Sequence, residues 1–172
     1  MISHSTSPHS FARTPTRGHY GASASEPDSG VRSEVAAFSN TDGRASEHGL
    51  LKFFLVEDNV IIRDNLAETL HELVGAEIVG VSDVQHEATQ WLCDPSHQWD
   101  VAVIDIFLKR GNGIQVVAAL QGHNFHQQVI VLSNYASPEV RRECLRLGAT
   151  AVFDKSTELD DLLDYCAKVQ PH

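Results

Sequence analysis

The chain has 172 residues and a formal net charge of −10, with 13 Lys and Arg against 23 Asp and Glu. This acidic balance argues against binding nucleic acid through its phosphates, which requires a basic surface. The cysteines Cys93, Cys144 and Cys166 lack the spacing of a zinc site and are expected to stay reduced in the cytoplasm. No apolar stretch approaches the roughly 20 residues of a membrane-spanning helix, and the N-terminus lacks the apolar core of a signal peptide.

Residues 1–49 differ in composition from the rest of the chain. They hold ten Ser, four His and three Pro, with few large apolar residues. Such a segment cannot bury enough apolar surface to offset its chain entropy, so we predict a disordered Ser/His-rich tail. A weak helix over residues 31–38 is the exception we expect. Residues 50–172 hold nearly all the Leu, Ile and Val and are long enough to form one folded domain.

Within residues 50–172, apolar runs alternate with segments of helical spacing. The runs predict strands over residues 50–56, 77–81, 101–108, 128–133 and 150–153. The spacing predicts helices over residues 60–74, 84–93, 114–120, 137–148 and 156–168. The predicted helix signals are Asn59, Ser137 and Thr157 as N-terminal caps and Gly75 as a stop. Five strand–helix units joined by short loops predict an α/β fold with a doubly wound, five-stranded parallel sheet.

The run at residues 101–108 is rich in β-branched residues, which is typical of a strand buried on both faces. Asp105 lies near its end, and a turn-like segment follows over residues 109–113. Three other predicted strands also end in polar side chains: Glu57 and Asp58, then Ser133, then Lys155. Because parallel strands end at one edge of the sheet, where ligands bind in open α/β folds, we expect these side chains to meet.

Their chemistry indicates a site for phosphoryl transfer. Three carboxylates in one pocket repel one another, and Mg²⁺ or Mn²⁺ would relieve that repulsion. A neighbouring lysine supplies a positive charge for phosphate, and a serine hydroxyl can donate to a phosphate oxygen. Asp105 could then remain ionised and attack phosphorus, as carboxylates do when they form aspartyl-phosphate intermediates.

Residues 50–172 resemble the response-regulator receiver domain of two-component signalling. The resemblance rests on the acid pair Glu57-Asp58, on Asp105 in Val-Ile-Asp-Ile-Phe-Leu, on Gly113 eight residues later, on Ser133, and on Lys155. It covers the whole predicted domain and leaves the tail unexplained. It implies a flavodoxin-like sheet with the strand order 2-1-3-4-5.

The resemblance also implies roles for individual residues. Asp105 would be the phosphoacceptor, and Mg²⁺ would bind Asp58, Asp105 and the backbone carbonyl of Phe107, with Glu57 acting mainly through water. Lys155, Ser133 and the backbone N–H of Asn134 would hold the phosphoryl group. We further hypothesise that Phe107 and Tyr135 hinder the attacking water and lengthen the lifetime of the phosphorylated state.

The chain departs from the family pattern at three positions, one of which is Ser156, where the family commonly has proline after the lysine. The family often has proline four residues after the acceptor, where this chain has Lys109. The family's aromatic switch residue usually lies three residues before the lysine, where this chain has Val152. Phe153 is one place away and is expected to face the other side of its strand. The usual coupling of hydroxyl and aromatic side chain is therefore not expected here.

We therefore expect a stand-alone response regulator in the cytoplasm. A histidine kinase or a histidine phosphotransfer protein would phosphorylate it, and it would assist that transfer without being an enzyme in the usual sense. Output would run through contacts with an unknown downstream protein, as a monomer or a phosphorylation-dependent dimer. No module follows residue 168, so DNA binding is not expected, and neither is a membrane partner.

Two alternatives stay open at this point. One is a small Mg²⁺-dependent phosphohydrolase with an Asp nucleophile, although such enzymes usually carry a second acid where this chain has Phe107. The other is a receiver-like binding module that is never phosphorylated. The intact set of Asp105, Ser133 and Lys155 argues against that module.

Overall fold

The computed structural model describes residues 49–171, so the predicted tail and its weak helix lie outside the described residues. The strands are β1 (Lys52–Val56), β2 (Glu77–Ser82), β3 (Val101–Ile104), β4 (Gln128–Ser133) and β5 (Ala151–Asp154). The helices are α1 (Val60–Val74), α2 (Gln85–Leu92), α3 (Gly113–Ala119), α4 (Pro138–Arg146) and α5 (Leu159–Cys166). No helix in this part of the chain is long and apolar enough to cross a bilayer.

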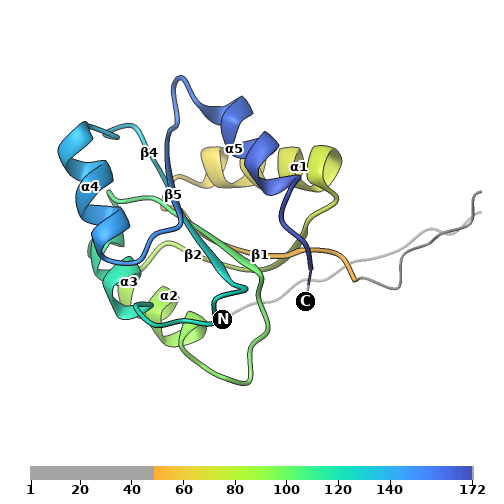
Figure 1. Cartoon of the computed structure of the whole chain (residues 1–172), viewed down its shortest axis with the longest axis horizontal. Helices are drawn as coiled ribbons and strands as arrows, with labels where there is room; N and C mark the ends of the chain where they lie inside the picture. The colour runs from red at the N-terminus through yellow and green to blue at the C-terminus, as the bar shows by residue number, and fades with distance from the viewer. Residues whose placement is uncertain (1–48, 172) are drawn as a thin grey trace, which may run out of the picture. The chain divides into compact units, whose positions relative to one another are not determined.

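The five strands form one parallel sheet in the order β2-β1-β3-β4-β5. Helices α1 and α5 lie on one face of the sheet, and α2, α3 and α4 cover the other (Figure 1). This is the doubly wound, flavodoxin-like arrangement that the sequence predicts, and the prediction is confirmed. The arrangement places every strand's carboxyl end at one edge of the sheet.

Two apolar cores form because successive strand residues point to opposite faces. On β1, Phe53 and Leu55 join the core beneath α1 and α5, whereas Phe54 and Val56 join the core beneath α2, α3 and α4. All four side chains are at most 1% exposed. Strands covered on both faces are therefore continuous apolar runs, which is why the sequence shows no alternation there.

Local capping explains where most helices begin and end. The Asn59 side chain accepts hydrogen bonds from the first turn of α1, and Gly75 ends that helix with a φ of 72°. The Ser137 side chain caps α4 by accepting from the Val140 N–H. The predicted cap at Thr157 is wrong, because Glu158 occupies the N-cap of α5 and makes no side-chain cap bond.

Strand β3 is shorter than the predicted run over residues 101–108. It ends at Ile104, and the Asp105 N–H makes one further bond to the Val56 carbonyl at 2.9 Å. Beyond that point the chain turns, because the Gly113 N–H donates to the Ile106 carbonyl at 2.9 Å. Asp105 therefore stands one residue past the strand, where the loop carries its side chain.

Gly113 lies where the start of α3 passes the backbone of Asp105. A Cβ atom at this position would lie 1.9 Å from the Asp105 carbonyl oxygen and 2.8 Å from its carbonyl carbon. These neighbours are backbone atoms, so relieving the contact means moving either α3 or Asp105. The missing side chain thus lets α3 pack directly behind the loop that carries Asp105.

Replacing Gly113 with alanine is expected to lower the free energy of unfolding by about 2–3 kcal/mol, because overpacking here displaces backbone. Urea denaturation followed by circular dichroism measures the change. Gly49→Ala is the control, since nothing lies within 4 Å of the Cβ it would add. A Gly113→Ala protein as stable as the parent would contradict the close approach of α3 to Asp105.

Candidate functional site

The polar residues at the strand ends are fixed by bonds that extend the sheet by one residue. The Glu57 N–H donates to the Ser82 carbonyl at 3.0 Å, and the Lys155 N–H donates to the Ser133 carbonyl at 3.2 Å. The Asp105 N–H bond to the Val56 carbonyl of β1 likewise extends the sheet by one residue. The sheet therefore holds the backbones of the acidic and basic residues in register with one another.

Glu57, Asp58 and Asp105 converge at this edge as the sequence predicts. Each offers a carboxylate oxygen, and these oxygens all lie within 4.8 Å of one another. Glu57 and Asp105 are buried, with 4% and 8% of their surface exposed, and Asp58 is partly exposed. We call these three residues the acidic triad. An all-oxygen donor set of this size suits a hard divalent cation, so the triad is able to bind one.

Lys155 lies against two members of the acidic triad. Its ammonium Nζ is 2.5 Å from Glu57 Oε2 and 2.7 Å from Asp105 Oδ2, and its side chain is 9% exposed. Buried like charges at this separation repel strongly, and the ammonium offsets that repulsion. Lys155 therefore keeps the Asp105 carboxylate in place while leaving its other oxygen to accept a bond from the Phe107 N–H at 3.3 Å.

The Ser133 hydroxyl, at the end of β4, is buried and makes no hydrogen bond within the described part of the chain. An unpaired buried hydroxyl costs about 1–3 kcal/mol, so such a group is retained where a ligand can pair with it. Asn134 follows on the exposed side, and its side chain accepts a bond from the Ser156 hydroxyl at 3.3 Å. The unpaired Ser133 hydroxyl is therefore available to donate a hydrogen bond to an oxygen-rich ligand.

Phe107 and Tyr135 lie on the loops that follow β3 and β4. Their rings contact each other with centroids 4.8 Å apart, and they are 57% and 65% exposed. Both rings therefore leave apolar surface in contact with water. The pair forms a partial apolar rim over the loops that carry Asp105 and Ser133.

Comparison with known proteins identifies the family to which this fold belongs. The family model of the response regulator receiver domain matches residues 53–167. The chain belongs to the response regulator receiver family. It is thus a phosphoacceptor signalling module rather than a conventional enzyme, and receiver domains act with histidine kinases.

Similar proteins match this receiver over part of their length. The DNA-binding transcriptional activator DevR/DosR of Mycobacterium tuberculosis is 30% identical over 101 residues, which are 59% of this chain and 46% of that protein. This chain spans about half the length of these and other curated relatives that it matches.

Solved structures show the same fold. The receiver domain of Francisella response regulator 1452 has a TM-score of 0.58 and 25% identity, over 67% of this chain and 93% of that one. A response regulator of Burkholderia pseudomallei, solved with a phosphorylated aspartic acid, a calcium ion and citrate, has a TM-score of 0.58 and 20% identity. That match covers 66% of this chain and 64% of that one.

The receiver's β5 strand lacks an aromatic residue at the position three before Lys155. Val152 occupies it and is buried beneath α4, with 7% of its surface exposed. Phe153 faces the opposite core, where its ring lies 5.9 Å from that of Tyr165. The prediction that Phe153 points to the other side of β5 is therefore confirmed.

Arg141 on α4 is a residue that sequence reasoning missed. Its guanidinium donates to the Ala136 carbonyl at 2.8 Å, to the Val152 carbonyl at 2.6 Å and to Glu158 Oε2 at 2.6 Å. Glu158 Oε2 also accepts from the Asp154 N–H at 2.7 Å. One side chain thus joins the loop after Ser133, strand β5 and the loop after Lys155. An arginine on a charged helix gives no sequence signal for such contacts.

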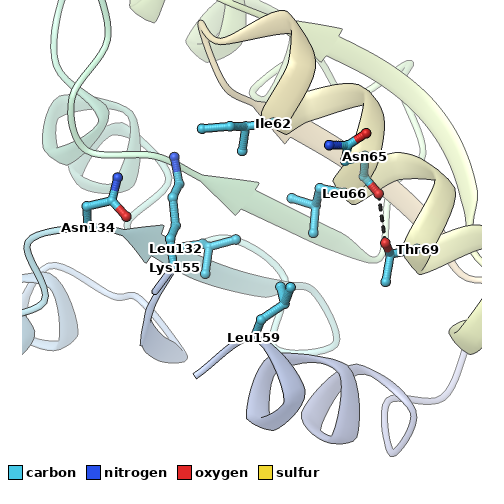
Figure 2. Close-up of a pocket in the computed structure, with 8 residues that line it drawn as sticks. All are labelled: Ile62, Asn65, Leu66, Thr69, Leu132, Asn134, Lys155 and Leu159. Carbon is cyan, nitrogen blue, oxygen red and sulfur yellow. Dashed lines mark hydrogen bonds between the residues drawn. The ribbon is translucent and has the colours of Figure 1, made fainter. Parts of the chain in front are cut away.

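A pocket of about 270 Å³ opens next to Lys155, between α1 and the start of α5. Figure 2 shows Ile62 and Leu66 from α1 facing Leu132 and Leu159 across this space, with Lys155 and Asn134 at one end. Its lining is largely apolar.

Replacing Arg141 with alanine is expected to lower the free energy of unfolding by about 1–3 kcal/mol at neutral pH, because it removes charge-assisted bonds. The Arg141 guanidinium, and then the Asp154 N–H, hold the pKa of Glu158 below its usual range. A lowered native pKa stabilises the fold above the unfolded value, and this contribution disappears as the pH falls through the native pKa. The cost of the substitution should therefore shrink in acid.

Urea denaturation between neutral and acidic pH measures this dependence. Arg142→Ala is the matched control, because Arg142 and its partner Glu139 are 71% and 72% exposed. Exposed pairs of this kind contribute about 0.2–1 kcal/mol. If Arg141→Ala and Arg142→Ala lowered the free energy of unfolding equally at neutral pH, the proposed contribution of Arg141 to stability would be contradicted.

Proposed function

We propose that this receiver accepts a phosphoryl group on Asp105 from a histidine kinase or a histidine phosphotransfer protein, in a Mg²⁺-dependent reaction. The observation that carries the proposal is the placement of Asp105 Oδ2 within 2.7 Å of the Lys155 ammonium, inside the acidic triad. The phosphorylated aspartic acid of the Burkholderia pseudomallei neighbour supports it, since that protein shares this fold.

The residues present fit a divalent ion. Asp58, Asp105 and the backbone carbonyl of Phe107 would hold Mg²⁺ or Mn²⁺ directly, and Glu57 would act mainly through water. When bound, the ion neutralises charge that develops on the phosphoryl oxygens during transfer. The carboxylates would then no longer depend on lysine alone to offset their mutual repulsion.

The chain's own residues perform the remaining tasks. An Asp105 carboxylate oxygen forms a bond to phosphorus, the bond from phosphorus to the donor's imidazole nitrogen breaks, and that nitrogen takes up a proton. Lys155 exchanges part of its contact with the two carboxylates for a phosphoryl oxygen. The orphan hydroxyl of Ser133 and the backbone N–H of Asn134 donate to the other oxygens, so the buried hydroxyl gains the partner it lacks.

Output would follow from those new contacts. The loop after Ser133 and the loop after Lys155 each accept a hydrogen bond from Arg141 on α4. A change at the phosphoryl site therefore biases the position of α4. We propose that the protein acts as a stand-alone response regulator and signals through a downstream protein in the cytoplasm. The signal is a population shift between two states, in a monomer or a phosphorylation-dependent dimer.

Incubation with acetyl phosphate and Mg²⁺ is expected to add one phosphoryl group to the chain, as measured by the intact mass. Asp105→Asn should abolish the adduct, because the amide is not a nucleophile toward phosphorus. Asp83→Asn is the matched control, since Asp83 follows β2 at the same edge of the sheet and pairs with Arg110 instead of the triad.

The other outcomes separate the alternatives. Absence of an adduct with acetyl phosphate and with a phosphorylated histidine phosphotransfer protein would favour a binding module that is never phosphorylated. Turnover of unrelated phosphate esters, lost in Asp105→Asn, would favour the phosphohydrolase. Either result would overturn the proposed function.

We also propose that the rim of Phe107 and Tyr135 lengthens the phosphorylated state. Replacing either residue with serine is expected to speed dephosphorylation by about two- to tenfold, equivalent to at most about 1.4 kcal/mol of barrier, because water gains access. Decay of the adduct after removal of the donor measures this. Phe125→Ser is the control, an 83% exposed ring before β4 at the opposite edge of the sheet. Unchanged half-lives in both rim variants would exclude this role.

A further inference from the structure

The loop after Asp105 brings Lys109 against the third member of the acidic triad. The Lys109 backbone N–H donates to Asp58 Oδ2 at 3.0 Å. The ammonium of the same residue lies 3.6 Å from Asp58 Oδ2 and donates to the Asp58 carbonyl at 3.3 Å. Lys109 thus contacts Asp58 through its main chain and its side chain at once.

These contacts complete a charge pattern in the site. Lys155 contacts Glu57 and Asp105, and Lys109 contacts Asp58. Within residues 49–171, every carboxylate of the acidic triad therefore has a lysine partner. A divalent ion that binds the triad must share Asp58 with a positive charge that is already beside it.

The two lysines differ in how firmly they are held. The Lys155 side chain is 9% exposed, whereas the Lys109 side chain is 76% exposed. An exposed ammonium is held weakly and loses little when it moves into water, while a buried one is costly to displace. Lys109 is therefore the positive charge that costs less to displace from the acidic triad.

We propose that Lys109 sets the divalent-ion affinity of the acidic triad by competing for Asp58. The proposal rests on the proposed function, because it takes the triad to be the Mg²⁺ site of the phosphoacceptor. Proline, which receivers often carry at this position, has neither an N–H nor a charge and makes no such competition. Lys109 would raise the Mg²⁺ concentration that this receiver needs and leave the acidic triad neutralised in part when the ion is absent.

Lys109→Met tests the charge alone, because it keeps the length of the side chain and the backbone N–H. Removing a positive charge a few ångströms from the ion is expected to tighten Mg²⁺ binding by about three- to tenfold at low ionic strength. The gain should diminish as NaCl is added, because salt screens exposed charges. Isothermal titration calorimetry with MgCl₂ measures the affinity without reference to phosphorylation.

Two further variants serve as controls. Lys109→Arg keeps the charge and should bind Mg²⁺ within about twofold of the parent. Arg110→Met removes the same charge from the neighbouring residue, whose guanidinium pairs with Asp83 at 3.4 Å rather than with the triad. It should also stay within about twofold, which separates a local competition from an effect of net charge.

The outcomes distinguish the competition by Lys109 from the proposed phosphoacceptor function. If the parent binds Mg²⁺ and Lys109→Met binds it no more tightly, the competition is excluded and the phosphoacceptor stands. If Lys109→Met and Arg110→Met tighten binding equally, net charge explains the gain and the competition is again excluded. Binding that appears only in Lys109→Met would support the competition, and binding in no variant would overturn it together with the Mg²⁺ dependence.

Discussion

The site depends on one ion-paired arrangement, the Lys155 ammonium between the Glu57 and Asp105 carboxylates. Carboxylates that are brought together and buried would otherwise repel one another strongly. The parallel sheet forces the carboxylates together, because it ends all its strands at one edge. Lys155 follows β5, the edge strand beside β4. Its ammonium offsets the repulsion between the two carboxylates.

The two cores explain how the edge stays rigid enough for this. Each buried strand is clamped between helices on both faces, so its last residue has little freedom to move. The close approach of Gly113 restrains Asp105 from the helix side, since the start of α3 lies directly against the Asp105 backbone. The chain thus places Asp105 on a loop and fixes that loop from the sheet side and the helix side.

Much of this could be predicted from the sequence, because the signals are local. Apolar runs marked the strands, Asn59 and Ser137 marked helix starts, and the polar residues after the runs indicated which side chains would meet. The end of β3 was missed since Ile106 to Leu108 are apolar, yet backbone bonding to Gly113 turns the chain there. Arg141 and the contact between Lys109 and Asp58 were missed because they join residues far apart in sequence whose types carry no signal alone.

The hydrogen bonds of Arg141 also affect how the molecule unfolds locally. Its guanidinium ties the segment after β4 to the segment after β5, and the Ser156 hydroxyl bonds to Asn134 across the same gap. Segments that share such bonds break them together, so the two loops form one cooperative unit for local unfolding. Solvent would then reach the backbone amides of both loops in a single event. A ligand that pairs with Ser133 or Lys155 would slow hydrogen exchange in both loops, including the one it does not touch.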